Sequence, residues 1–151
     1  MTFPAPFGSL LSAVQEFFMD ISYTDKRDFT LTEINELFST VDWAVSRRTK
    51  QLLPALNGGF SNVISARDGG RLVGLICSMD DGVLTAYIHY LLVRPDYRGR
   101  GIGTELLHKM TEIYKSYFRI EVIADNAAAG FYLAHGFGEI NARPLAFLPK
   151  G

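Results

Sequence analysis

The sequence is poor in cysteine. Its one cysteine, Cys77, cannot form a disulfide within the chain and follows the apolar residues Leu75 and Ile76. We therefore interpret it as a small core residue and expect a reducing compartment, the cytoplasm. The chain has no Cys-x-x-Cys motif and no cluster of cysteine and histidine. This argues against a structural zinc site, and we expect no bound metal.

An excess of one charge sign and a long apolar run are also missing. Fifteen Lys and Arg residues oppose sixteen Asp and Glu residues, which leaves a formal net charge of −1. This balance argues against nucleic acid or an anionic membrane as the main partner. The longest apolar stretch falls well short of the roughly 20 residues that span a membrane. Residues 1–19 are apolar but lack the basic start of a signal peptide.

The length and apolar content of the chain fit one domain with a substantial core. It has 151 residues, of which 48% are hydrophobic and 21% are charged, a composition typical of globular proteins. We divide it into an N-terminal helical extension, residues 1–19, and a domain, residues 20–151. The apolar stripe of this extension could join two copies in a homodimer or pack on the domain's own core. The stripe consists of Leu10, Leu11, Val14, Phe17 and Phe18.

The order of the periodic segments predicts a mixed α/β domain around a central sheet. After the extension, helices are expected from Thr30 or Thr32, over residues 46–56, 101–116 and 126–135. Strands are expected over residues 21–23, 62–67, 72–79, 85–93, 118–124 and 140–148. The turn Asp68-Gly69-Gly70 separates the second and third strands and is typical of a hairpin.

A glycine-rich loop with two arginines lies between a strand and a helix. It runs through Arg98, Gly99, Arg100, Gly101, Ile102, Gly103 and Thr104. Glycines let backbone N–H groups approach an anion closely, and a helix N-terminus adds unpaired donors and partial positive charge. The pattern suits a pyrophosphate, although a tight strand-to-helix turn would also explain it. It lacks the third glycine of a dinucleotide fingerprint and the Gly-Lys-Ser/Thr of a P-loop.

Two motifs make the chain resemble the GCN5-related N-acetyltransferase (GNAT) superfamily. Arg98, Gly101 and Gly103 match the acetyl-CoA loop of that family, Gln/Arg-x-x-Gly-x-Gly/Ala. The second motif spans residues 125–137 and looks like Asn-x-x-Ala-x-x-Phe-Tyr-x-x-x-Gly-Phe. Its residues in register are Ala128, Phe131, Tyr132, Gly136 and Phe137, with Asp125 and Asn126 where the family often has asparagine.

The resemblance implies a GNAT fold and acetyl-CoA as co-substrate. In this α/β (α+β) fold, a mixed, mostly antiparallel central sheet is splayed at its middle and flanked by helices. The pantetheine arm would lie in the gap between strands 85–93 and 118–124. Backbone groups of Leu91, Leu92 and Val93 would pair with it, Asp125 and Asn126 would border it, and the N–H groups from Arg98 through Thr104 would hold the pyrophosphate.

The implied reaction is direct transfer of an acetyl group to an amine in a ternary complex. Tyr132 would protonate the leaving thiolate, and the Val93 N–H would stabilise the developing oxyanion. Alternation on the strand predicts Tyr87, His89, Leu91 and Val93 on one face, where His89 could remove a proton from the amine. Tyr132 as an aromatic core residue and His89 as a hydrogen-bonded core histidine are the structural alternatives.

The acceptor is expected to be a small molecule with a primary amine. Trp43 could wall a pocket for an apolar or aromatic amine beside Tyr87 and His89, or it could be a core tryptophan. Acetylation of a protein lysine or N-terminal amine is an alternative, and so is a module that binds acyl-CoA without turnover.

Overall fold

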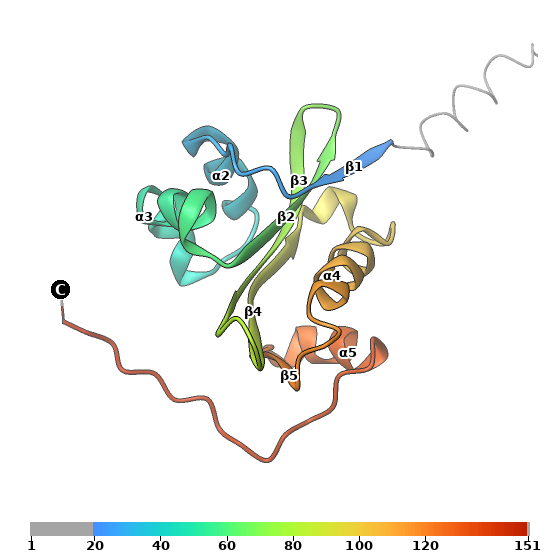
Figure 1. Cartoon of the computed structure of the whole chain (residues 1–151). Coiled ribbons are helices and arrows are strands. Elements are labelled where there is room, and N and C mark those ends of the chain that lie inside the picture. Colours follow the sequence, from blue (N-terminus) through green and yellow to red (C-terminus); the bar gives the residue numbers. More distant parts are fainter. Residues whose placement is uncertain (1–19, 151) are drawn as a thin grey trace, which may run out of the picture.

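A five-stranded sheet lies at the centre of the domain in the computed structural model, which describes residues 20–150 (Figure 1). The predicted helix over residues 1–19 lies outside this part of the chain. The strands stand in chain order, and they are β1 (Ile21–Thr24), β2 (Asn62–Asp68), β3 (Arg71–Asp80), β4 (Thr85–Val93) and β5 (Arg119–Val122). Neighbouring strands from β1 to β4 are antiparallel, whereas β5 is parallel to β4. The mixed, mostly antiparallel sheet is therefore confirmed.

Helices cover both faces of this sheet (Figure 1). On one face lie α2 (Leu31–Phe38), the 3₁₀ turn η1 (Ala44–Arg47), α3 (Thr49–Pro54) and the π-helical turn η2 (Ala55–Gly59). On the other face lie α4 (Ile102–Ile113) and α5 (Asn126–Ala134), and η3 (Pro95–Tyr97) joins β4 to α4. Each face has its own buried apolar cluster. Within residues 20–150, no helix has the length and apolar character needed to cross a membrane.

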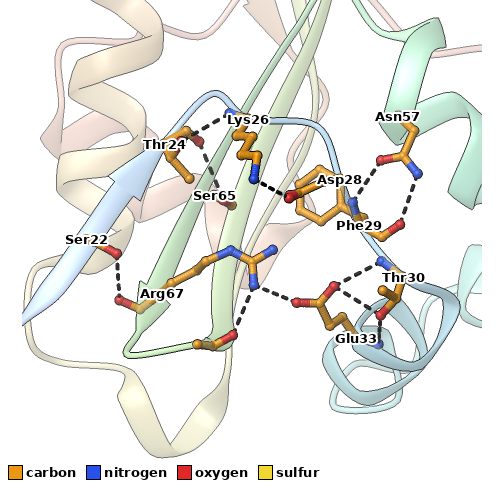
Figure 2. A network of polar contacts seen from close by, with 11 residues as sticks. Ser22, Thr24, Lys26, Asp28, Phe29, Thr30, Glu33, Asn57, Ser65 and Arg67 are labelled. Carbon is orange, nitrogen blue, oxygen red and sulfur yellow. Dashed lines mark hydrogen bonds and ion pairs between the residues drawn. The ribbon is translucent and has the colours of Figure 1, made fainter.

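A polar network fixes α2 against the sheet (Figure 2). The Thr30 hydroxyl accepts the Glu33 N–H, and the Glu33 carboxylate accepts the Thr30 N–H, which forms a capping box. Arg67 on β2 donates to the other oxygen of the same carboxylate. The amide of Asn57 bonds both the N–H and the carbonyl of Phe29, at 3.0 Å each. These bonds tie the start of α2 to β2 and tie Phe29, which precedes α2, to η2.

The predicted last strand, residues 140–148, is wrong for this structure. Residues 137–150 form neither strand nor helix. A strand needs a partner for its N–H and C=O groups, and Pro144 and Pro149 have no N–H to donate. The apolar pattern of Ile140 and of residues 145–148 suggested a strand, but the structure supplies no partner within residues 20–150.

β4 contains one residue more than its pairing with β3 requires. Cys77 pairs with Tyr90, and the next residue of β3, Ser78, pairs with Ile88. His89 therefore has no position opposite it and forms a β-bulge. A bulge bends its strand and increases the local twist.

The bulge corrects one prediction from the sequence. Leu91 and Val93 pack with Ile88 in the cluster below α4. Tyr87 precedes Ile88 and so points to the opposite face, the one covered by α2 and α3. Tyr87 and His89 therefore do not share a face with Leu91 and Val93, because the extra residue resets the alternation between them.

The sheet opens at the same point. The parallel pairing of β4 with β5 ends where Ile88 stands opposite Val122. Beyond Ile88, β4 continues to pair with β3 as far as Val93, but it has no further pairing with β5. The predicted splay in the middle of the sheet is confirmed, and it coincides with the bulge.

Candidate active site

A cavity of about 620 Å³ lies where β4 and β5 separate. Its walls come from the end of β4, the glycine-rich loop, the start of α4, the start and middle of α5, and the segment after α2. The lining residues are Val41, Trp43, Leu91, Leu92, Val93, Tyr97, Arg98, Gly99, Gly101, Ile102, Gly103, Thr104, Asp125, Ala127, Ala128, Phe131 and Tyr132. Arg98 and Asp125 are the charged residues among them, so the lining is close to neutral.

The glycine-rich loop reaches the cavity through two left-handed residues. Gly99 has φ +74° and Gly101 has φ +80°, a region that side chains with a Cβ avoid. Gly101 is the N-cap of α4, and no side chain caps this helix. The first N–H groups of the helix have no intrahelical acceptor by helix geometry, so they are available to an anion at the cavity.

The side chains of the two arginines in the loop differ in their position relative to the cavity. Arg98 lines the cavity, and its Nε donates to the Val93 carbonyl at 3.2 Å. The Arg100 guanidinium lies over the ring of Tyr97, 5.3 Å from its centre, and does not line the cavity. The Tyr97 hydroxyl donates to Asp68 at 2.7 Å. Tyr97 thereby ties the start of the loop to the β2–β3 hairpin.

Tyr132 stands inside the cavity on α5. It is buried between Phe131 and Phe137, in edge-to-face contact with both rings. Burial, together with the charge of Asp125 and the neighbouring Tyr87, raises the pKa of Tyr132 to about 12. The hydroxyl is therefore protonated at neutral pH and can donate a proton or a hydrogen bond.

The start of α5 is fixed by Asp125, whose carboxylate accepts the Ala128 N–H at 2.8 Å. Asp125 lines the cavity, whereas Asn126 does not.

At the other end of α5, His135 connects two helices that border the cavity. Its Nδ1 donates to the Phe131 carbonyl at 2.7 Å, and its Nε2 lies 3.1 Å from the Thr104 hydroxyl.

Part of the cavity wall is aromatic. Trp43 lies on Tyr90 with ring centres 5.8 Å apart and planes at 23°. Phe38 meets both rings edge to face. Trp43 lines the cavity and is only partly buried, so it combines a packing role with an accessible face. Tyr90 was not predicted from the sequence, because only the tertiary fold brings it to Trp43.

His89 and Tyr87 lie beside the cavity rather than in its lining. His89 is exposed on the bulge, with ring centres 4.1 Å from Tyr90 and 5.7 Å from both Phe60 and Tyr87. Burial of part of its ring lowers the pKa of His89. Burial raises the pKa of Tyr87, opposed by a hydrogen bond with the Ile123 backbone. A neutral imidazole thus lies against Tyr90, which packs on the cavity residue Trp43.

The comparisons with known proteins agree with this geometry. A family model described as the acetyltransferase (GNAT) family matches residues 25–137. The chain belongs to the GNAT family of acetyltransferases. Members of the family typically use acetyl-CoA as co-substrate. Of the residues that the resemblance assigns to it, all but Arg100 and Asn126 line the cavity.

Individual GNAT relatives are distant. An uncharacterised N-acetyltransferase, ycf52, from Pyropia yezoensis is 26% identical over 125 residues, 80% of this chain and 71% of the relative. The N-alpha-acetyltransferase RimI of Mycobacterium tuberculosis is 31% identical over 96 residues, 60% of this chain and 61% of the relative. A GNAT-family acetyltransferase from Streptococcus pneumoniae has the same fold, with a TM-score of 0.72 and 24% identity over 87% of this chain and 99% of its own.

Proposed function

We propose that this GNAT protein transfers the acetyl group of acetyl-CoA directly to the primary amine of a small molecule. The observation that carries the proposal is the continuity of one cavity. Its lining includes residues of the glycine-rich loop, the end of β4, Tyr132 and Trp43. The pyrophosphate, the thioester and the acceptor can therefore occupy one cavity at the same time.

The co-substrate would be held mainly by backbone groups. N–H groups at Gly101–Thr104 and the Arg98 side chain would bind the pyrophosphate. The part of β4 that has left β5, residues 89–93, would pair with the amides of the pantetheine arm. Asp125 and the small side chains Ala127 and Ala128 border this path, which leaves width for a thin chain.

The chemical step needs three groups around the thioester. The amine nitrogen attacks the carbonyl carbon, the C–N bond forms, and the C–S bond breaks as the thiolate leaves. The Val93 N–H would stabilise the oxyanion, and Tyr132 would give its proton to the sulfur. His89 would take the amine proton through water or Tyr87, because its ring lies outside the cavity lining.

An acceptor with one amine and an apolar or aromatic body fits the part of the cavity wall at Trp43 best. Trp43 offers an aromatic face there, and among the described lining residues the carboxylate is that of Asp125. A polycation would need several anionic groups, whereas this lining offers the single carboxylate of Asp125, one oxygen of which already accepts the Ala128 N–H. Polyamines and other polycations are therefore poor candidates.

The test is a panel of amines assayed for release of free thiol from acetyl-CoA. It should contain amines with aromatic and with aliphatic bodies, a polyamine, and peptides with a free N-terminus or a lysine. We expect kcat/KM to be highest for a monoamine with an apolar body, with intersecting lines in two-substrate kinetics. Trp43→Ala should raise the KM for that amine and leave stabilisation by acetyl-CoA unchanged. Phe118→Ala, at an exposed ring away from the cavity, is the matched control.

Acetylation of a protein N-terminus is the second candidate, because one relative is named an N-alpha-acetyltransferase. Faster turnover of the peptide with a free N-terminus would favour it. Stabilisation by acetyl-CoA without thiol release from any acceptor would instead favour a binding module without turnover.

A further inference from the structure

His135 joins α5 to α4 through both nitrogens of its ring. Nδ1 lies 2.7 Å from the Phe131 carbonyl oxygen, and Nε2 lies 3.1 Å from the Thr104 hydroxyl. A carbonyl oxygen can only accept a hydrogen bond, so the one proton of the neutral imidazole is fixed on Nδ1. Nε2 of the neutral ring therefore has a lone pair, and the Thr104 hydroxyl donates its hydrogen to that nitrogen.

Thr104 lies at the part of the cavity where a helix begins. It lines the cavity and is the third residue of α4, whose N-cap is Gly101. The first bond within the helix runs from the Glu105 N–H to the Gly101 carbonyl at 3.0 Å, so the Thr104 N–H has no intrahelical acceptor. This N–H can bind a phosphate oxygen, and the hydroxyl of the same residue can do so only when its hydrogen is not donated to His135.

We propose that His135 controls the co-substrate site through Thr104, so that binding of the pyrophosphate is coupled to uptake of one proton on Nε2 of His135. This coupling rests on the proposed function, in which the pyrophosphate lies at the start of α4. In the protonated ring both nitrogens donate. Nε2 then donates to the Thr104 oxygen, and the hydroxyl hydrogen turns toward a phosphate oxygen. His135 does not line the cavity, so it acts as a positioning residue.

The two protonation states of His135 present different groups to an anion. With the neutral ring, the Thr104 oxygen turns only lone pairs toward the cavity, and these repel a phosphate. With the imidazolium, the same hydroxyl donates a hydrogen bond and is itself polarised by a charged donor, which strengthens that bond. Linkage is reciprocal, so an anion that binds more tightly to the protonated form also makes His135 easier to protonate.

Other titratable groups on the two helices that contact His135 do not offer this coupling. Residues 126–134 of α5 include no charged side chain. On α4, Glu105 and Lys109 pair with each other at 3.2 Å, and His108 is exposed one turn after Thr104. No ion pair of the described chain includes His135. The arginines of the glycine-rich loop stay charged throughout the neutral range.

The test measures the affinity for dephospho-CoA by calorimetry at about pH 5.5 and about pH 8, on either side of the range in which histidine titrates. This ligand keeps the pyrophosphate and lacks the ribose phosphate of CoA, whose own ionisation changes with pH. We expect the wild-type protein to bind roughly tenfold more tightly at the lower pH. His135→Gln should lose that difference, and His108→Gln is the matched control that should keep it.

Substitutions of Thr104 test the route of the coupling. Thr104→Ser keeps the hydroxyl and should keep the pH difference, whereas Thr104→Val should reduce it to less than about twofold. In NMR spectra of the wild-type protein, the titration midpoint of the His135 ring should rise by about one pH unit when dephospho-CoA binds, which is the same tenfold change in affinity.

Three results would overturn the coupling and leave the pyrophosphate site intact. They are an equal pH difference in the wild type and in His135→Gln, a full pH difference in Thr104→Val, and a His135 midpoint that does not move on binding. Absence of binding of both dephospho-CoA and acetyl-CoA at either pH would instead overturn the proposed site, and the coupling with it.

Discussion

Ile88 and Val122 form the last cross-strand pair between β4 and β5. One residue further along β4 lies the bulge at His89, and from there one side of β4 has no strand partner in the described chain. The backbone groups that would have bonded β5 are thus available beside the cavity. Substitutions around this opening can test each part of the site separately.

Gly101→Leu should abolish stabilisation by acetyl-CoA. Gly101 has φ +80°, and a Cβ at this position would meet no atom within 4 Å, so a side chain would extend into the space where the pyrophosphate approaches. The left-handed backbone also costs about 1–2 kcal/mol for a residue with a Cβ. The measurement is the melting temperature with and without acetyl-CoA, with NADH as a ligand that should give no shift.

Gly82→Leu separates backbone strain from loss of the site. Gly82 has φ +82° and the same open surroundings, but it lies in the β3–β4 turn. Both variants should lose similar stability, and only Gly82→Leu should keep its response to acetyl-CoA. Loss of the response in both variants would count against a pyrophosphate site at Gly101.

Tyr132→Phe should lower kcat by roughly 10- to 1,000-fold and leave the affinity for acetyl-CoA within a few-fold. The ring and its contacts with Phe131 and Phe137 remain, and only the proton donor is lost. The loss should appear in kcat because the hydroxyl acts mainly as the sulfur gains charge. Steady-state kinetics with the best amine of the panel is the measurement.

Tyr114→Phe is the matched control for this substitution. The buried Tyr114 hydroxyl bonds Ser78, Asp80 and Asn62 at 2.6–2.9 Å, away from the cavity. Its removal should cost about 1–3 kcal/mol of stability and leave kcat unchanged. Unchanged turnover of Tyr132→Phe with every active amine would assign Tyr132 a packing role.

His89→Ala should lower turnover at pH 7 by roughly a hundredfold, the usual range for a lost general base. Partial burial lowers the pKa of His89, so the wild-type rate should rise with pH through an apparent pKa below about 6.5. The variant should lack that rise, and its deficit should shrink at high pH, where free amine is abundant. A pH–rate profile of both proteins decides whether His89 moves the proton or only packs against Tyr90.

Glu33→Gln should destabilise the fold by about 1–3 kcal/mol at pH 7. Burial works to raise the pKa of Glu33, but the bonds from Arg67 and Thr30 outweigh it and lower the pKa. The ionised form therefore stabilises the fold above the unfolded-state pKa of about 4.3, and this contribution is lost as the pH falls through the lower folded-state pKa. Denaturant titrations at pH 7 and pH 3 should show the gap between the two proteins narrowing in acid.

Glu112→Gln serves as the control for that experiment. Glu112 pairs with Lys115 at 3.5 Å on the exposed surface of α4, where an ion pair contributes little. Its substitution should change stability by less than about 0.5 kcal/mol at either pH. An equal effect of the two substitutions would mean that the network of Figure 2 does not stabilise α2.

Local chemistry made part of this structure predictable. The hairpin at Gly69, the glycine-rich loop at Gly101 and the helix that follows it depend on turn geometry and helix capping within a few residues of sequence. The capping box at Thr30 and Glu33 is local in the same sense. These elements agree with the sequence because no distant contact is needed to specify them.

Contacts between distant segments were not predictable in the same way. β4 is apolar on both faces, so no hydrophobic pattern shows that His89 is an extra residue. Tyr90 meets Trp43 only once α2 and the sheet are packed. Residues 140–148 have the composition of a strand, but a strand also requires an available edge, which sequence periodicity does not supply.

The two apolar clusters keep the domain folded, and the extra residue at position 89 lies where the sheet opens. If position 89 were deleted, Ile88 and Tyr90 would become neighbours opposite Ser78 and Cys77, and each remaining β4 side chain would stay on its present face. Neither apolar cluster needs the extra residue. A chain shortened by this one residue should therefore melt at least as high as the parent, and its β4 should lose the bend at the point where β5 ends. The opening between the two strands can then change in evolution or by design without repacking the core.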